Sequence, residues 1–277
     1  MITNKLNLPD AFVKYAKSDH SIIDNRYSVT ELLKPVKEIL LYREHYNEID
    51  VDVSDLIPAL FGTAVHNILE ENTTATDTLI PEYALETQFE GITIAGRIDL
   101  VDFKNCIITD YKTCSVNKII KQDFNDWKLQ GLAYAYLLFK EKGIIIRELN
   151  FIALLKDWSK LKQMGPASPI YIWKYAIADS DYDYIEKYLK DKIAIIKSGI
   201  APDCTDAERW FTGDKYAVYK KAGDKKATIL CDSEDEAKGY IENKLNGYGF
   251  YQLRKGEDIK CKYYCDVCKY CKRGNEE

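Results

Sequence analysis

The sequence has no stretch that approaches the ~20 consecutive apolar residues of a membrane-spanning helix. Its beginning, MITNKLNLPDAFVKYAK, lacks the apolar run of a secretory signal peptide. An internal repeat and a low-complexity linker are also missing, and the lack of a repeat excludes solenoid architectures. We therefore expect a soluble, cytoplasmic protein that does not bind a membrane.

The sequence also has no excess of positive charge. Its 39 Lys and Arg residues are outnumbered by 44 Asp and Glu residues, which gives a formal net charge of −5. This balance does not indicate a general nucleic-acid binder, although a local basic track is compatible with it. The 277 residues, 46% of them hydrophobic, suffice for one large domain or two small ones.

The order of predicted elements indicates an α/β protein. Helical spacing extends to about residue 47, with Ser28 and Glu31 in capping-box spacing, and Pro35 either lies in the first turns or breaks the helix. Further elements are a helix ending near 72, strands at 82–89 and within 91–113, a helix at 122–142, strands at 144–155 and 170–178, a helix at 182–198, and short strands at 216–220, 227–231 and 250–254. This order predicts an α/β core in residues 1–200 and a small extension, packed on the core, in residues 201–277.

Two aspartates in residues 91–113, GITIAGRIDLVDFKNCIITDYKT, carry the strongest functional signal. The stretch predicts two strands joined at residues 104–105. Counting outward from a two-residue turn places Asp99 directly opposite Asp110, and Lys112 then shares their face of the sheet. Because like charges directly opposite one another destabilise a sheet, this arrangement indicates a cation-binding or reactive site.

The predicted register depends on the turn, although a longer symmetric turn would keep the same pairing. The pair Lys104–Asn105 is not one that tight hairpins prefer. A bulge would shift the register by one residue and turn the two carboxylates to opposite faces. One aspartate would then be a solvated edge residue and the other a turn acid.

Hard oxygen ligands of this kind suit Mg²⁺ or Mn²⁺. Asp99 and Asp110 offer carboxylates, and the backbone carbonyl of Tyr111 is placed to add a third oxygen. Lys112 is suited to orient or deprotonate an attacking water or to offset developing negative charge, and its alternative role is a salt bridge to either aspartate. Glu86, in the preceding strand, is either an additional metal ligand or an exposed strand acid.

Polar side chains at helical spacing accompany the acidic pair. His66 lies on a predicted helix with Glu70 one turn later, and a single helical histidine is more often structural than metal-bound. Gln130 and Tyr134 are also four residues apart, on a helix that is otherwise apolar. A buried amide and phenol require hydrogen-bond partners, which these elements alone do not identify.

These motifs follow one another along the chain as GTAVH with His66, GRID with Asp99, DYKT with Asp110 and Lys112, and QGLAY with Gln130 and Tyr134. This succession resembles the PD-(D/E)XK nuclease superfamily, in the RecB-like branch that includes lambda-type exonucleases. The resemblance covers roughly residues 28–155. The sequence departs from the family's name-giving motif, because Ile98 replaces the proline before Asp99.

The resemblance implies a restriction-endonuclease-like fold, in which helices flank a mixed central β-sheet. It implies cleavage of DNA phosphodiester bonds by Mg²⁺ or Mn²⁺ held on His66, Asp99, Asp110 and the Tyr111 carbonyl. The catalytic residues would be Asp99, Asp110, Lys112, Gln130 and Tyr134. The helical Q-x-x-x-Y motif favours an exonuclease over an endonuclease.

Such an exonuclease would act on linear duplex or single-stranded ends of DNA. The expected process is recombination, repair or replication of a bacterial or phage genome, with a recombination or single-strand-binding protein as the expected partner. The alternative is a non-catalytic nucleic-acid-binding or assembly protein that keeps the same fold.

Four cysteines crowd the tail CKYYCDVCKYC, and in the cytosol they indicate a metal rather than disulfides. In one interpretation, Cys261, Cys265, Cys268 and Cys271 bind one Zn²⁺ or a cluster among themselves. In another, Cys204 joins Cys261, Cys265 and Cys271, which resembles the iron–sulfur site of some RecB-like nucleases, although there the remote cysteine precedes the core. In a third, all are free thiols on a surface tail.

Two lysine clusters are candidates for contacts with phosphate groups. The first follows the acidic hairpin and comprises Lys118, Lys121 and Lys128. The second surrounds a predicted C-terminal hairpin and comprises Lys215, Lys220, Lys221, Lys225 and Lys226. Runs of this kind are more often a solvated face, and both interpretations stay open.

Overall fold

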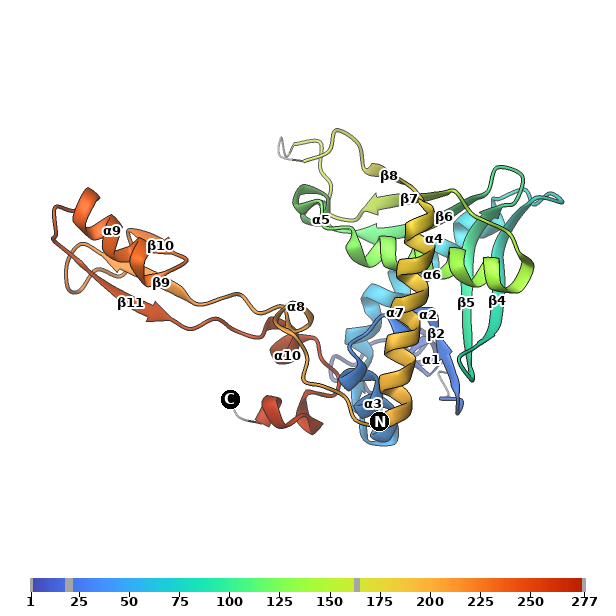
Figure 1. Ribbon diagram of the computed structural model, residues 1–277, viewed down its shortest axis with the longest axis horizontal. Helices are drawn as coiled ribbons and strands as arrows, with labels where there is room; N and C mark the ends of the chain where they lie inside the picture. The colour runs from blue at the N-terminus through green and yellow to red at the C-terminus, as the bar shows by residue number, and fades with distance from the viewer. Residues whose placement is uncertain (1, 18–21, 162–164, 276–277) are drawn as a thin grey trace. The chain divides into compact units, whose positions relative to one another are not determined.

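The computed structural model describes residues 2–17, 22–161 and 165–275, and the chain forms two compact units (Figure 1). The first unit is Met1–Ala201 and the second is Pro202–Glu277. Each has its own hydrophobic core. Among the described residues, no helix combines the length and the apolar character needed to cross a bilayer.

A six-stranded mixed sheet forms the centre of the first unit. Its strands are β2 (Arg26–Ser28), β4 (Leu79–Phe89), β5 (Ile92–Asp102), β6 (Ile107–Cys114), β7 (Glu148–Leu155) and β8 (Ile170–Ala176). β4 pairs with β5 in antiparallel fashion over nearly the whole length of both strands. β2 pairs in parallel with the first residues of β5. β6 pairs in antiparallel fashion with the last residues of β5. β7 then pairs in parallel with β6 and antiparallel with β8.

Helices flank this sheet on both faces. They are α1 (Asp10–Ala16), α2 (Val29–Leu32), α3 (Val36–Glu44), α4 (Ile57–Glu71), α5 (Val116–Lys121), α6 (Asn125–Lys142) and α7 (Asp179–Ser198), with the 3₁₀ turns η1 (Tyr46–Glu48) and η2 (Val53–Leu56). The ring of Tyr111 contacts His66 of α4, whereas the next residue, Lys112, contacts α6. Because successive strand residues point to opposite faces, α4 and α6 lie on opposite sides of the sheet.

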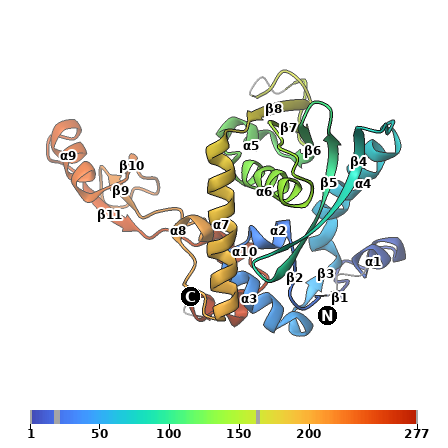
Figure 2. The same ribbon diagram turned by 45° about the vertical axis from the view of Figure 1, so that its right-hand side comes forward.

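The predicted fold class is therefore confirmed. α6 is the most buried helix and packs against β4, β6 and β7, while α7 runs beside it (Figure 2). Gly131 sets how closely α6 approaches the sheet, since a Cβ atom at this position would lie 2.6 Å from Cδ1 of Leu149. A short parallel pair, β1 (Ile2–Thr3) with β3 (Val51–Asp52), completes the unit.

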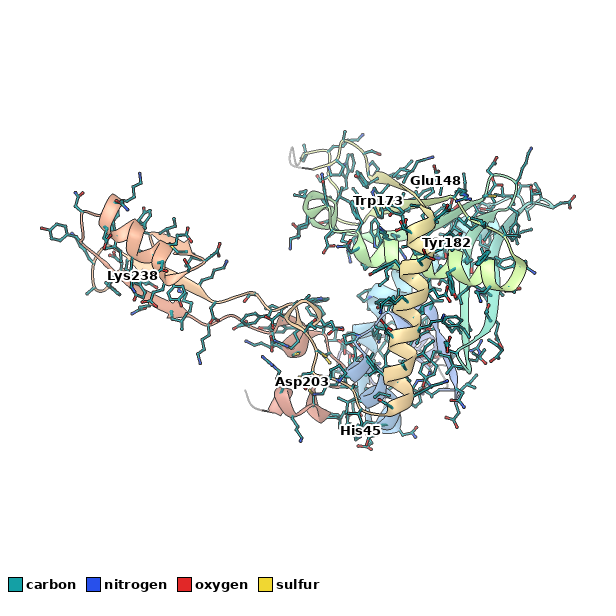
Figure 3. The ribbon with its side chains drawn as sticks, in the orientation of Figure 1. His45, Glu148, Trp173, Tyr182, Asp203 and Lys238 are labelled. Carbon is teal, nitrogen blue, oxygen red and sulfur yellow. The ribbon has the colours of Figure 1, made fainter. Side chains whose placement is uncertain are left out.

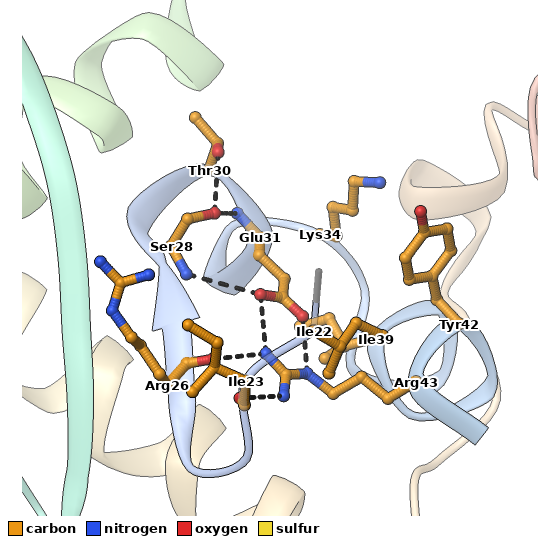
Figure 4. A pocket seen from close by; sticks show the side chains of 10 residues that line it. All are labelled: Ile22, Ile23, Arg26, Ser28, Thr30, Glu31, Lys34, Ile39, Tyr42 and Arg43. Carbon is orange, nitrogen blue, oxygen red and sulfur yellow. Dashed lines mark hydrogen bonds and ion pairs between the residues drawn. The ribbon is translucent and has the colours of Figure 1, made fainter. Parts of the chain in front are cut away.

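The predicted capping box at Ser28 and Glu31 is present at the start of α2. Pro35 breaks the helix, because α2 ends before it and α3 begins directly after it. Glu31 also accepts a 2.7 Å hydrogen bond from Arg43, whose guanidinium lies 3.6 Å from the ring centre of Tyr27. Ser28, Glu31 and Arg43 line a cavity of about 430 Å³ (Figure 4).

Several predicted boundaries differ from the structure by a few residues, among them the starts of β4, α7 and β10. The helix expected from residue 122 begins at Asn125, because Gln122 adopts a left-handed φ of 52° and ends the preceding helix. Its end at Gly143, with a φ of 70°, is as predicted. The strand expected from residue 144 begins at Glu148.

The second unit contains a three-stranded antiparallel sheet in the order β10, β9, β11. Its elements are α8 (Asp206–Arg209), β9 (Lys215–Tyr219), β10 (Ile229–Cys231), α9 (Glu234–Lys244), β11 (Phe250–Arg254) and α10 (Ile259–Tyr263), followed by η3 (Cys268–Tyr270) and η4 (Lys272–Asn275). α9 packs on this sheet through its own Ala237 over Val218 and Cys231, and all three are fully buried. The three predicted strands are present, and the packing of this unit on the first stays a prediction.

Candidate active site and metal centre

The site lies where β5 and β6 separate. The two strands have the predicted register, with Leu100 opposite Thr109, but their pairing ends there, one step before Asp99 and Asp110. Beyond the paired residues, a side chain joins the two strands. Oδ2 of Asp99 in β5 accepts a 2.6 Å hydrogen bond from the backbone N–H of Tyr111 in β6. Polar side chains from other elements contact the strand residues beyond this point, a region we call the gap.

His66 enters this gap from α4. Its Nδ1 lies 3.1 Å from Oδ1 of Asp99, and its Nε2 lies 3.0 Å from the carbonyl oxygen of Tyr111. The hydrogen bond to Asp99 raises the pKa of His66, and burial of the ring opposes this shift. Both ring nitrogens thus face oxygen acceptors, which suits the doubly protonated ring.

Glu82 of β4 is a third member of the site, and the sequence analysis missed it. The pairs on either side of it in the β4–β5 register bring it opposite Asp99, and its backbone has a left-handed φ of 48°. Burial raises the pKa of Glu82, and the nearby charge of Asp99 adds to this shift. A ligand atom from each of His66, Glu82 and Asp99 lies within 4.8 Å of the other two.

The signal for Glu82 is present in the sequence. Glu90 and Gly91 form a two-residue turn with left-handed φ angles of 49° and 74°, a conformation that favours tight hairpins. Counting back from this turn leads to Glu82 opposite Asp99, just as counting from the other turn leads to Asp110. Glu86, expected as an additional ligand, lies elsewhere: its carboxylate is 58% exposed and lies 3.1 Å from Arg26.

Asp110 and Lys112 form the other half of the site. Nζ of Lys112 lies 2.7 Å from Oδ2 of Asp110 and donates a 2.7 Å hydrogen bond to Oε1 of Gln130. Burial raises the pKa of Asp110 to about 6; the charge of Asp99 acts in the same direction and Lys112 opposes it. Asp110 therefore lies beside Lys112 and is not one of the three residues His66, Glu82 and Asp99 whose ligand atoms lie within 4.8 Å of one another.

Gln130 and Tyr134 continue this chain of contacts along α6. Nε2 of Gln130 donates to the Tyr134 hydroxyl over 3.4 Å. The Tyr134 ring covers Gly96 of β5, where a Cβ atom would come within 2.6 Å of the ring. Burial raises the pKa of Tyr134 to about 12, so the phenol keeps its proton at neutral pH.

The residues at this site fit a divalent cation. His66, Glu82 and Asp99 offer one nitrogen and two carboxylate groups within a small volume. Oδ2 of Asp110 is buried and lies 2.7 Å from Nζ of Lys112. An oxygen of this kind is stabilised by a nearby positive charge, which Lys112 supplies here.

The three lysines expected to contact DNA have different surroundings. Lys118 lies 2.7 Å from Asp126. Lys128 lies 3.3 Å from Asp181 and 4.2 Å from the centre of the Tyr175 ring. Lys121 is exposed and makes no ion pair with any described residue. Two of the three ammonium groups thus have intramolecular partners.

The cysteines do not form a close ligand group in the described residues, since no three of their sulfur atoms lie within 4.8 Å of one another. Burial raises the pKa of the Cys204 thiol to about 11, and the charges of Glu208, Cys261 and Cys271 add to the shift. Cys265 and Cys268 are half-buried in the tail. A metal site that includes Cys204 stays a prediction.

Sequence comparison places the protein in a family. The family model described as PD-(D/E)XK nuclease superfamily matches residues 72–272. The chain belongs to this superfamily. As a PD-(D/E)XK protein it is a nuclease-type hydrolase, and Asp99, Asp110 and Lys112 lie within the matched region. The RecB-like branch stays a prediction.

Other comparisons give weaker similarities. No curated protein sequence matches the chain. A crystal structure described as SSO0001 is 18% identical, with a TM-score of 0.46, over 66% of this chain and 81% of that chain. The alkaline exonuclease LHK-Exo from Laribacter hongkongensis is 9% identical, with a TM-score of 0.37, over 63% and 89% of the two chains. Its complex with dAMP is 11% identical, with a TM-score of 0.35, over the same shares. These scores are below 0.5, so the family assignment rests on the sequence match.

Proposed function

We propose that the chain is a Mg²⁺- or Mn²⁺-dependent DNA exonuclease that acts in recombination, repair or replication. The observation that supports this most is the grouping of His66, Glu82 and Asp99 next to the Asp110–Lys112 pair in a PD-(D/E)XK protein. In the reaction, a water oxygen bonds to phosphorus, one P–O ester bond breaks, and the leaving oxygen gains a proton.

The metal ligands in this proposal are His66, Glu82, Asp99, Asp110 and the carbonyl of Tyr111. A divalent ion bound there would supply Lewis acidity and a water with a lowered pKa. Before the ion binds, His66 must release its contact with Tyr111 or Asp99, since both ring nitrogens are engaged. Metal binding would therefore replace a contact of His66 with Tyr111 or Asp99 by a bond to the ion.

Lys112 is the residue that acts on the substrate directly. An ammonium group has three N–H donors, and Asp110 and Gln130 engage two of them. The third remains for a phosphate oxygen or for the attacking water, where its charge offsets the negative charge that develops during hydrolysis. Gln130 and Tyr134 are positioning residues, because they act through Lys112 and contact no reacting atom.

The exonuclease assignment is supported by the Q-x-x-x-Y motif, whose two side chains meet on α6. Incubation with linear and with closed circular duplex DNA in Mn²⁺ tests it. We expect degradation of the linear DNA alone. Cutting of the circle would instead indicate an endonuclease.

Catalysis itself is tested with Asp110→Ala and Lys112→Ala. Both should lose cleavage while keeping the wild-type circular dichroism spectrum. Glu86→Ala is a matched control, because its carboxylate lies with Arg26 and should be dispensable. Retained cleavage in the first two variants would remove the site assignment. DNA binding by the wild-type protein without any cleavage in Mn²⁺ would favour the non-catalytic scaffold.

A further inference from the structure

The loop that joins β9 to β10 is strongly basic. It spans residues 220–228, KKAGDKKAT, and we call it the basic loop. Its four lysines, Lys220, Lys221, Lys225 and Lys226, are all exposed. The only acidic residue among them is Asp224. The loop thus concentrates positive charge in a protein whose net charge is negative.

The four ammonium groups lack carboxylate partners: within the described residues none of them forms an ion pair. Lysines elsewhere on the surface commonly do. Examples are Lys14 with Asp10, Lys174 with Glu148, Lys187 with Asp191, Lys190 with Glu186, and Lys262 with Glu257. In the same unit, Lys238 of α9, labelled in Figure 3, lies 2.6 Å from Glu234. Single unpaired lysines such as Lys121 occur elsewhere, but the basic loop gathers four of them within nine residues.

Backbone contacts give the basic loop a defined shape. The N–H of Lys221 donates to Oδ2 of Asp224 over 3.1 Å, and the N–H of Asp224 donates to the carbonyl of Lys221 over 3.3 Å. Gly223, between them, has a φ of 94°. The N–H of Thr228 donates to Val218 over 2.7 Å and begins the pairing with β9. The turn thus separates two lysine pairs, and its acidic residue is occupied by the backbone.

Aromatic side chains lie at the same end of the sheet. Tyr219, the last residue of β9, stacks on Phe250 with ring centres 5.2 Å apart. Tyr248, two residues before Phe250, is 79% exposed. Exposed aromatic rings beside a basic track are suited to stack on nucleic-acid bases.

We propose that the basic loop binds the phosphate backbone of the nucleic acid. This inference rests on the proposed function, which supplies a polyanionic substrate. A protein partner fits less well, since protein interfaces are depleted in lysine and need buried apolar anchors at their centre. The only apolar side chains in the basic loop are those of Ala222 and Ala227. Lysine is well suited to phosphate, which it contacts as a point charge without base specificity.

The experiment measures the affinity of the full-length protein for labelled DNA by fluorescence anisotropy, without added divalent metal, across a series of salt concentrations. Each phosphate contact contributes about 0.9 to the slope of log K against log salt for duplex DNA and about 0.7 for single strands. The double variants K220A/K221A and K225A/K226A should each lower the slope by about 1.8 on duplex or about 1.4 on single strands. The corresponding Lys→Arg variants should keep the wild-type slope.

The matched control is K187A/K190A. It removes the same two charges from α7, where both lysines are exposed and paired with acidic residues. If the loop variants and this control give the same slope, the inference is overturned. It is also overturned if the loop variants weaken binding to poly-glutamate and leave DNA binding unchanged. Failure of the proposed function has a different signature, because wild-type protein would then bind DNA and not cleave it in Mn²⁺.

Discussion

Glu82 lies opposite Asp99 across β4 and β5, and their carboxylates meet His66 within a group of ligand atoms no more than 4.8 Å apart. Burial raises the pKa of Glu82, and the charge of Asp99 adds to this shift because two carboxylates this close repel each other. A bound cation relieves this repulsion. Metal binding and protonation of Glu82 therefore compete, since each reduces the repulsion between the two carboxylates.

Replacement of Glu82 by Gln should weaken metal binding. The amide keeps the size of the side chain but removes a negative ligand, so we expect the Kd for Mn²⁺ to rise by about tenfold or more, or ~1.4 kcal/mol. Isothermal titration calorimetry measures this, and excess Mn²⁺ should restore part of the cleavage. Glu86→Gln is the control. A weaker site in Glu86→Gln and an unchanged one in Glu82→Gln would return the ligand role to Glu86.

Replacement of Gln130 by Ala should lower kcat and leave KM nearly unchanged. Lys112 would lose the 2.7 Å contact that fixes its amine, and loss of alignment by about 1 Å costs on the order of 10²-fold in rate. Gln130→Glu keeps an oxygen acceptor and should retain more activity. Gln88→Ala removes an exposed amide that bonds to Thr93, and it should match the wild-type rate. Equal rates for Gln130→Ala and wild type would rule out the positioning role.

Metal affinity should rise with pH through the range near 6. The pKa of Asp110 is about 6, so protons compete with metal below that pH and cease to compete above it. Titrations between pH 5 and 8 should show this rise. Asp110→Asn should reduce the rise of metal affinity with pH, because the variant lacks this carboxyl group. An unchanged pH profile in Asp110→Asn would show that other groups cause the rise.

Stability without metal should change in the opposite direction. The folded pKa of Asp110 lies above its ordinary value of 3.8, so the protonated form stabilises the fold below that value and this contribution is lost as pH rises to about 6. His66, whose pKa is also raised, contributes stability below its ordinary value of 6.5, and this is lost as pH rises through its folded pKa. Thermal melts at pH 4–8 measure this loss of stability. Both Asp110→Asn and added Mn²⁺ should reduce the fall in melting temperature as pH rises.

Replacement of Gly96 by Ala should destabilise the first unit by about 1–3 kcal/mol, because the added methyl group would lie 2.6 Å from the Tyr134 ring and 3.3 Å from Val29. Gly62→Ala, on α4, is the matched control. Its nearest neighbour is 4.0 Å away, and alanine favours a helix interior by roughly 0.5–1 kcal/mol. Urea unfolding compares the two. If Gly96→Ala is as stable as Gly62→Ala, the close packing of Tyr134 has no energetic role.

The cysteines of the second unit should bind a metal. Protein purified under anaerobic conditions should be brown if it carries an iron–sulfur cluster and colourless if it carries zinc, and elemental analysis measures either one. Cys204→Ser and Cys261→Ser should both lose the metal. Cys106→Ser, at the turn between β5 and β6, should keep it. Wild-type protein with neither iron nor zinc would leave these residues as free thiols.

Local patterns in the sequence were sufficient to predict the fold and two local features of the candidate site. The turn between β5 and β6 fixes their register as far as Leu100 and Thr109, next to Asp99 and Asp110, and helical spacing brings Gln130 and Tyr134 to one side of α6. These predictions depend on residues that are neighbours along the chain. The same reasoning applied to the turn at Glu90 would have found Glu82.

Other contacts depend on segments that meet only in the folded protein. Lys128 was a candidate DNA contact, and α7 brings Asp181 to within 3.3 Å of it. Glu86 was either an additional metal ligand or an exposed strand acid, and it is exposed beside Arg26 of β2. Neither partner is visible from the spacing of nearby residues, because both arise from strand order and helix packing.

The early end of the β5–β6 ladder has a structural consequence for nuclease activity. Because pairing stops at Leu100 and Thr109, the Asp99 carboxylate contacts the N–H of Tyr111 and His66 of α4, while Lys112 contacts Gln130 of α6. Side chains from helices on opposite faces of the sheet therefore meet residues at the same end of this strand pair. Mutations that extend the ladder past Leu100 should stabilise the protein against unfolding and abolish cleavage, because they displace these contacts.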